Sequence, residues 1–132
     1  MDFSPVGKVC SFCGLVGEKD TKFAGGLGAM MCADCLEYYY DVFQSPKRSA
    51  AITRPPWDDM TDAELLSKLP LISITADQVN EFLRQWVVLL RSRKLSWAEI
   101  GKVLGVSRQA AWERFSSAVE DAGGSQSKDA TA

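Results

Sequence analysis

Two kinds of segment alternate along this chain: stretches in which apolar residues recur at helical spacing, and stretches rich in glycine or proline. The clearest apolar stripe occupies residues 76–93 and predicts a long helix with Thr75 as its N-cap. Its apolar side chains, the aromatic ones included, are expected to form a core. They are Val79, Phe82, Leu83, Trp86, Val87 and Leu90.

A shorter helix is predicted just before the long one. Thr61 and Glu64 have the spacing of a capping box, in which each side chain satisfies a backbone N–H at the start of a helix. We therefore expect a helix at residues 62–69. Pro70 is expected to end it, because proline donates no backbone hydrogen bond.

The stretch LSWAEIGKVLGVSRQAAWERF, residues 95–115, predicts two helices joined by a tight turn. Ser96 is expected to cap the first helix and Gly105 to end it, while Ser107 caps a second helix that runs to residue 122. Gly101 would let the two helices approach closely. The apolar residues expected to pack inward or fill the corner are Trp97, Ile100, Val103, Leu104, Val106, Ala110, Ala111 and Phe115.

The N-terminal part shows short apolar runs between glycine-rich turns. Gly14 favours a chain reversal, and the glycines of residues 25–28 predict a turn before a short strand at residues 29–31. The stretch LEYYYDVF, residues 36–43, then predicts a helix. Its apolar face is expected to comprise Leu36, Tyr39, Tyr40 and Phe43, with Tyr38 and Val42 off that face.

These patterns divide the chain into four parts. Residues 1–44 form a small N-terminal domain, and residues 45–60 form a linker that contains Pro46, Pro55 and Pro56. Residues 61–122 form a helical domain, and the small polar tail at residues 123–132 is expected to be disordered. The predicted fold class is α+β and mostly α.

All four cysteines lie in two CxxC pairs, with the spacing Cys10-x2-Cys13-x18-Cys32-x2-Cys35. Two such pairs supply four thiolates for a tetrahedral Zn²⁺, which stabilises a segment too short to bury a core. The chain contains no histidine, so the cysteines must bind the metal alone. We predict one structural Zn²⁺ per chain, with redox chemistry and iron–sulfur ligation as alternatives.

Charge is distributed unevenly along a chain whose net charge is −2. Residues 1–83 carry −5, residues 84–114 carry +5 and residues 115–132 carry −2. A basic segment inside an acidic chain indicates one polyanion-binding face, although a solvated helical surface gives the same pattern. The basic residues of the segment are Arg84, Arg91, Arg93, Lys94, Lys102, Arg108 and Arg114.

Composition limits the classes of function. Without histidine the commonest general base is absent, and no other catalytic constellation occurs, so we do not expect an enzyme. The first residues lack the basic and apolar regions of a signal peptide, and the longest apolar run, residues 86–90, is too short to span a bilayer. We expect a cytoplasmic protein, nucleoid-associated if it binds DNA, with no membrane partner.

The helix pair within residues 95–122 has the layout of a helix-turn-helix, whose second helix lies in the major groove. The residues expected to contact bases, or a phosphate at the helix cap, are Ser107, Arg108, Gln109, Trp112 and Glu113. Further phosphate contacts are expected from Arg91, Arg93, Lys94, Lys102 and Arg114. The expected partners are double-stranded DNA and a second copy of the chain, because such proteins usually read two half-sites.

Two segments resemble known families. The stretch CSFCGLVGEKDTKFAGGLGAMMCADCLEYYYDVF, within residues 8–44, resembles the N-terminal C4 zinc-binding domain of ClpX-type protease unfoldases. That resemblance implies a treble-clef-like fold that dimerises and docks adaptors or substrates. No GxxxxGK[ST] loop occurs, so the chain is not itself the unfoldase.

The pattern W-A-E-I-G-x-x-L-G-V-S-R-Q-A-A-W resembles actinobacterial helix-turn-helix regulators and the C-terminal half of sigma-factor-like domains, over residues 76–120. This resemblance implies a trihelical unit that binds DNA or, in some such units, protein. Two functions follow. The first is a zinc-containing transcriptional regulator that reads DNA with helix 107–122. The alternative is a non-catalytic adaptor that meets the Clp protease machinery through its zinc domain.

Overall fold

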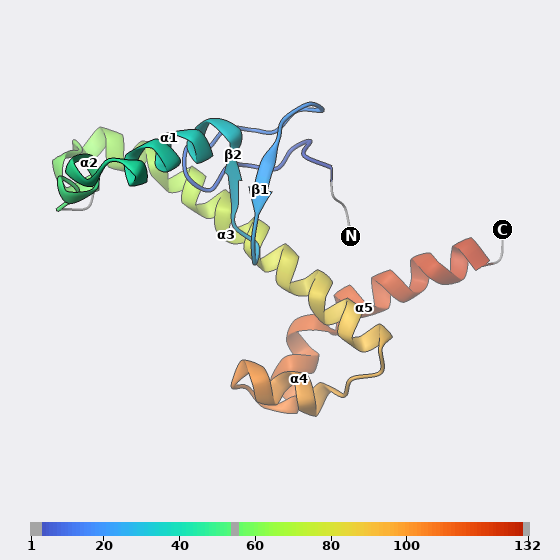
Figure 1. Cartoon of the computed structure of the whole chain (residues 1–132). Helices are drawn as coiled ribbons and strands as arrows, with labels where there is room; N and C mark the ends of the chain where they lie inside the picture. The colour runs from blue at the N-terminus through green and yellow to red at the C-terminus, as the bar shows by residue number, and fades with distance from the viewer. Residues whose placement is uncertain (1–3, 54–55, 131–132) are drawn as a thin grey trace. The chain divides into compact units, whose positions relative to one another are not determined.

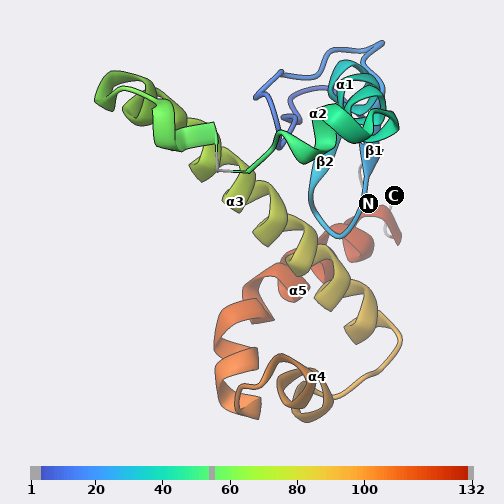
Figure 2. The same ribbon diagram turned by 60° about the vertical axis from the view of Figure 1, so that its left-hand side comes forward.

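The computed structural model describes residues 4–53 and 56–130. Within them the protein is mostly helical with one small two-stranded sheet (Figures 1 and 2), in agreement with the predicted class. The elements are β1 (Phe23–Gly25), β2 (Met30–Cys32), α1 (Ala33–Gln44), α2 (Pro46–Ala50), η1 (Pro56–Asp59), α3 (Asp62–Ser92), α4 (Trp97–Leu104) and α5 (Arg108–Ala130). The chain forms two compact units, Met1–Asn80 and Glu81–Ala132.

The sheet of the N-terminal unit is a hairpin. Strands β1 and β2 pair antiparallel, with Phe23 opposite Cys32. The Gly26 N–H donates to the Ala29 carbonyl at 3.0 Å, and Gly28 has a φ of +99°, which glycine adopts without steric cost. The predicted turn is therefore confirmed, and the predicted strand is found one residue further along, where it ends on a cysteine.

A second ribbon precedes this hairpin in the chain. Residues 7–10 run antiparallel to residues 15–17, and the Cys10 N–H donates to the Leu15 carbonyl at 2.9 Å. Gly14 closes the turn with a φ of +83°, so the chain reversal predicted there is confirmed. The ribbon places the first cysteine pair at its closed end.

Helix α1 follows β2 directly and buries a different face from the predicted one. Val42 is buried and Tyr39 is half-buried. The predicted face is mostly exposed: Leu36 at 50%, Tyr40 at 62% and Phe43 at 70%. Cys35 must face the other cysteines, and Tyr39 and Val42 follow it at i+4 and i+7 on the same side of the helix. The position of the cysteine therefore sets the rotation of α1.

Helix α3 joins two segments that were predicted to be separate helices. The capping box at its start is confirmed: the Thr61 N–H donates to Glu64 Oε2 at 2.8 Å, and the Glu64 N–H donates to Thr61 Oγ1 at 3.2 Å. Pro70 lies inside the helix rather than at its end, and Thr75 is internal rather than a cap. An interior proline costs about 3 kcal/mol. Just beyond the proline, the Leu71 side chain lies against the turn at Gly14.

The segment predicted as a linker contains structure of its own. Helix α2 starts at Pro46, whose missing N–H costs little at a first helical position, and Ser45 Oγ accepts the Arg48 N–H at 3.2 Å. Pro55 lies outside the described residues. The division between the two units also falls elsewhere, at Asn80 within α3.

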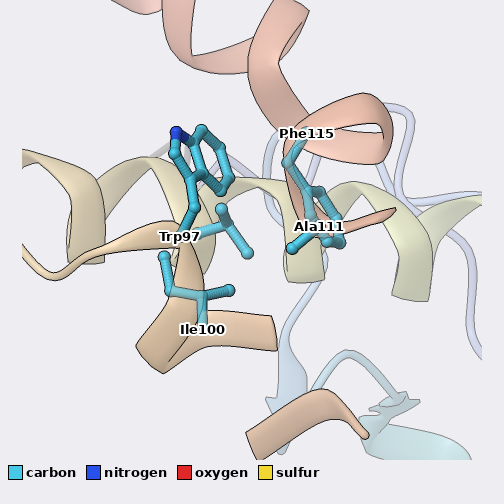
Figure 3. Close-up of a cluster of buried hydrophobic side chains, with 5 residues drawn as sticks. Trp97, Ile100, Ala111 and Phe115 are labelled. Carbon is cyan, nitrogen blue, oxygen red and sulfur yellow. The ribbon is translucent and has the colours of Figure 1, made fainter. Parts of the chain in front are cut away.

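The C-terminal unit has a hydrophobic core between α3, α4 and α5. Val87, Trp97, Ile100, Ala111 and Phe115 are each at most 8% exposed. Figure 3 shows Trp97 and Ile100 of α4 gathered with Ala111 and Phe115 of α5 in one cluster. Packed against them are Leu83, Leu90 and Val119. Of the residues of α3 predicted to form a core, Leu83, Val87 and Leu90 therefore do so. Two others are exposed, Val79 at 36% and Trp86 at 44%.

Both ends of α4 and the start of α5 agree with prediction. Ser96 caps α4 in a complete capping box, with the Glu99 N–H donating to Ser96 Oγ at 3.1 Å. Gly105 ends the helix with a φ of +73°. The Ala110 N–H then donates to Ser107 Oγ at 3.0 Å at the start of α5. These signals are local, which is why the sequence reveals them.

Gly101 permits the close approach that was predicted, although its neighbour is the turn rather than α5. A Cβ at Gly101 would lie 2.8 Å from the Val106 carbonyl oxygen. Other inward positions were predicted wrongly, because the core is small and these side chains fall on its outer side. The exposed ones are Ala110, Val103 at 82%, Leu104 at 37% and Val106 at 43%.

Helix α5 continues to Ala130, beyond the predicted end at residue 122 and through most of the tail predicted to be disordered. Residues 116–130 contain no proline, so nothing sterically blocks the helix, and Gly123 and Gly124 only lower its propensity. Residues 131–132 of that tail lie outside the described residues.

Candidate functional site

The four cysteines meet in the N-terminal unit. Cys10 and Cys13 come from the closed end of the first ribbon, Cys32 ends β2, and Cys35 lies in the first turn of α1. Their sulfur atoms all lie within 4.8 Å of one another. The Sγ–Sγ distance is 3.9 Å for Cys10 and Cys35 and 3.7 Å for Cys13 and Cys32.

These distances suit a single metal ion. Four thiolates at the usual zinc–sulfur distance of about 2.3 Å occupy a tetrahedron with edges of about 3.8 Å. In a [4Fe–4S] cluster each thiolate binds a different iron, so the sulfurs surround a cage rather than one point. The four cysteines can therefore hold one metal ion, and they are the one such group among the described residues.

The backbone around Cys10 favours its thiolate form. Burial opposes ionisation there, but the N–H groups of Cys32, Cys13 and Phe12 outweigh it and lower the pKa of Cys10 to about 6. The Cys32 N–H lies 3.3 Å from Cys10 Sγ. Burial, followed by the neighbouring thiols, raises the pKa of Cys35. Ionising several of the four thiols is therefore unfavourable without a counter-ion. A cation among the sulfurs would stabilise their thiolate forms.

Most of the predicted DNA-contacting residues are exposed in the C-terminal unit. They are Arg93, Lys94, Lys102, Ser107, Arg108, Gln109, Trp112, Glu113 and Arg114. Those from 107 to 113 share one end of α5, its cap and first two turns. Within this group the Gln109 Nε2 donates to Glu113 Oε1 at 3.1 Å. Arg114 lies with its guanidinium 4.9 Å from the Phe115 ring centroid while remaining exposed.

Arg91 does not fit its predicted role as a phosphate ligand. Its guanidinium lies 4.7 Å from the centre of the Trp97 ring, and its Nη1 donates to the Leu95 carbonyl at 2.7 Å. Its Nε atom is buried without a hydrogen-bond partner. Arg91 therefore stabilises the connection between α3 and α4 through a cation–π contact and a hydrogen bond.

Two residues that position the cysteine pairs were not predicted. Ser11 links the pairs, since its N–H donates to the Met30 carbonyl at 2.7 Å and its Oγ accepts the Met30 N–H at 3.1 Å. Gln78 of α3 bonds to the backbone of Val9. These partners lie 19 and 69 residues apart in sequence, so no local pattern indicates either contact.

Comparisons with known proteins give this chain no family. Protein-family models, curated proteins and solved structures all lack a match to it. In the part of the chain that the structure describes, no helix has the length and apolar content needed to cross a bilayer.

Proposed function

We propose that the protein is a zinc-stabilised DNA-binding protein, a transcriptional regulator, that reads the major groove with the start of α5. The observation that carries the proposal is the exposed polar end of α5 beyond a sharp turn at Gly105. The preceding helix α4 is fixed to α5 by a buried core that includes Ile100 and Phe115. A rigid helix pair with one exposed N-terminal end is the arrangement that a helix-turn-helix requires.

The side chains at that end have the chemistry of base recognition. Arg108 can donate two hydrogen bonds to guanine, and Gln109 can pair in the same way with adenine. The bond from Gln109 to Glu113 uses one of the two amide hydrogens, leaving the other and the carbonyl oxygen for a base. Trp112 is 45% exposed and suits a thymine methyl or a sugar.

Phosphate binding would come from the residues around this end. The N-terminus of α5, capped by Ser107, favours an anion because its N–H groups point outward. Lysine and arginine side chains supply the charge that makes such binding dependent on salt. The proposed phosphate ligands are Arg93, Lys94, Lys102 and Arg114, all exposed.

Zinc is the metal proposed for the cysteine cluster, in a treble-clef-like domain. Four thiolates close the tetrahedral shell and leave no position for a substrate, so the role is structural. Protein purified without added zinc is expected to contain one equivalent per chain. An iron–sulfur chromophore, or the absence of metal, would contradict this assignment.

The DNA proposal is tested by binding to duplexes over a range of salt concentrations. Arg108→Ala should cost roughly 1–3 kcal/mol at a cognate site and relax the preference at one base position. Lys102→Ala should instead weaken all duplexes alike and lower the log–log salt slope by about one unit. The matched control is Arg84→Ala, because Arg84 is already bonded to Glu81 at 3.0 Å on α3. No change of affinity or preference for Arg108→Ala and Gln109→Ala would refute the recognition-helix assignment.

The second candidate is a protein-binding adaptor of the Clp machinery, favoured by the exposed apolar side of α1. Leu36, Tyr40 and Phe43 recur there at helical spacing and are each at least half exposed. Such a face suits a protein contact, either with another protein or with a second copy of the chain. This function predicts no salt-dependent DNA binding. A strictly monomeric mass at micromolar concentrations would exclude the stable homodimer.

A further inference from the structure

One glutamine of α3 binds the backbone beside the first cysteine pair. The Val9 N–H donates to Gln78 Oε1 at 2.9 Å, and Gln78 Nε2 donates to the Val9 carbonyl at 3.1 Å. A carboxamide carries the same donor and acceptor as a peptide group. Gln78 therefore pairs with Val9 as a residue of a neighbouring strand would.

The ribbon geometry explains why Val9 needs this partner. The residues on either side of it pair across the ribbon: the Lys8 carbonyl accepts from Gly17, and the Cys10 N–H donates to Leu15. In an antiparallel pair the intervening residue directs its N–H and carbonyl to the opposite edge. Val9 is only 4% exposed, so water cannot readily replace Gln78 there.

Two further contacts place the same part of α3 against the turns at Gly14 and Gly28. A Cβ at Gly14, in the turn after Cys13, would lie 2.8 Å from the Leu71 side chain, and a Cβ at Gly28 would lie 3.2 Å from Val79. Between residues 62 and 80, the side chains that are not exposed are Leu71, Thr75 and Gln78. Their spacing of i, i+4 and i+7 defines one helix face.

We infer that Gln78 is a positioning residue of the metal centre, and that metal binding and the docking of residues 71–79 stabilise each other. Gln78 holds Val9, and Val9 is bonded covalently to Cys10, whose sulfur is one of the four ligands proposed. Leu71 supports the turn that follows Cys13. If docking of residues 71–79 raises the affinity for metal, metal binding must stabilise that docking by the same free energy, because the coupling between two equilibria is reciprocal. The inference rests on the proposed zinc centre.

Zinc affinity of the full chain, measured by competition with a chromophoric chelator, tests the role of Gln78. Gln78→Ala should weaken zinc binding by about tenfold or more, as removal of residues that orient metal ligands commonly does. Gln78→Glu keeps the acceptor but sets a second oxygen against the Val9 carbonyl, so it should weaken binding at least as much. Asn80→Ala is the matched control, since Asn80 is an exposed carboxamide on the same helix. Equal affinities for Gln78→Ala and Asn80→Ala would overturn the inference.

Amide hydrogen exchange of the unaltered protein provides a test without any substitution. On removal of zinc, the amides of residues 71–79 should lose protection by at least about tenfold, while those of α4 remain protected. Unchanged protection at residues 71–79 would overturn the coupling. If the unaltered chain binds no zinc at all, the proposed zinc centre fails. If it binds zinc with no effect on α3, the centre stands and only the inference fails.

Discussion

The two units of this chain reach a fixed structure by different means. In the N-terminal unit the buried apolar residues described are Val9, Cys10, Cys32 and Val42, and two of these are candidate metal ligands. In the C-terminal unit five buried side chains form one cluster around Trp97 and Phe115. The first has too little apolar burial to offset the entropy of ordering its loops, whereas the second has a conventional core. We therefore expect metal to stabilise one unit and packing to stabilise the other.

The sharpest way to separate the units is to remove a ligand. Cys32→Ser should unfold the ribbon, the hairpin and α1, because zinc binding by small cysteine domains contributes on the order of 10–16 kcal/mol. Hydrogen exchange should show lost protection there and retained protection in α4 and the first part of α5. Ser11→Ala is a milder control that keeps all four sulfurs. If metal-free Cys32→Ser kept the protection of residues 23–32, metal would not be what stabilises the N-terminal unit.

The converse change truncates the core of the other unit. Phe115 is 1% exposed, so Phe115→Ala should lower the free energy of unfolding of the C-terminal unit by about 3–5 kcal/mol. Denaturant titration measures this loss, and metal content should not change. Phe43→Ala is the matched control, because Phe43 is 70% exposed and its truncation should cost no more than about 0.5 kcal/mol. Loss of zinc from Phe115→Ala would show that the units are not independently stabilised.

A third prediction concerns Gly101, which lies against the backbone of the turn between α4 and α5. The Cβ of Gly101→Ala would lie 2.8 Å from the Val106 oxygen and 2.9 Å from the Ser107 oxygen, both backbone atoms. The turn must shift, so we expect a loss of about 1–3 kcal/mol although alanine is the better helix former. The control is Gly123→Ala in α5, where no atom lies within 4 Å of the added carbon. Gly123→Ala should leave the free energy of unfolding unchanged or raise it. A change of the same sign for Gly101→Ala and Gly123→Ala would contradict the packing described.

The smallest expected effect concerns the cap of α4. Ser96→Ala should cost about 1 kcal/mol, because the Glu99 N–H loses its acceptor. The backbone N–H and then the hydroxyl of Ser96 lower the pKa of Glu99, so the folded state favours the carboxylate. This stabilisation is fully present above the ordinary glutamate pKa and is lost as the pH falls through the lower folded-state pKa. Urea titrations at several acidic pH values should show that dependence, and Glu99→Gln should abolish it.

The features that the sequence reveals are those with local causes. Ser96, Gly105 and Ser107 act within four residues of the backbone groups they satisfy, and the capping box at Thr61 does the same. The cysteine spacing is equally readable, because ligand geometry constrains each CxxC pair. The capped helix starts, the end of α4 at Gly105, the turns and the candidate ligands could therefore be predicted.

The features that escaped prediction depend on distant parts of the chain. Leu36 and Val42 are both apolar residues on α1, and only the position of Cys35 decides that Val42 rather than Leu36 faces inward. Arg91 has a side chain suited to binding phosphate, yet its guanidinium contacts the Trp97 ring and donates to the Leu95 carbonyl. Pro70 would end an isolated helix, but α3 continues through it. In each case a tertiary contact outweighs a local preference.

The position of the boundary between the units, inside α3 at Asn80, limits how this chain can be cut and recombined. A gene fragment ending at residue 44 would encode all four cysteines but would leave the N–H and carbonyl of Val9 without Gln78. Such a fragment would present an open strand edge, which is prone to aggregation. The smallest piece that evolution or an engineer could transfer whole therefore includes half of a helix, and the proline-containing segment that looks like a natural cut site is not one.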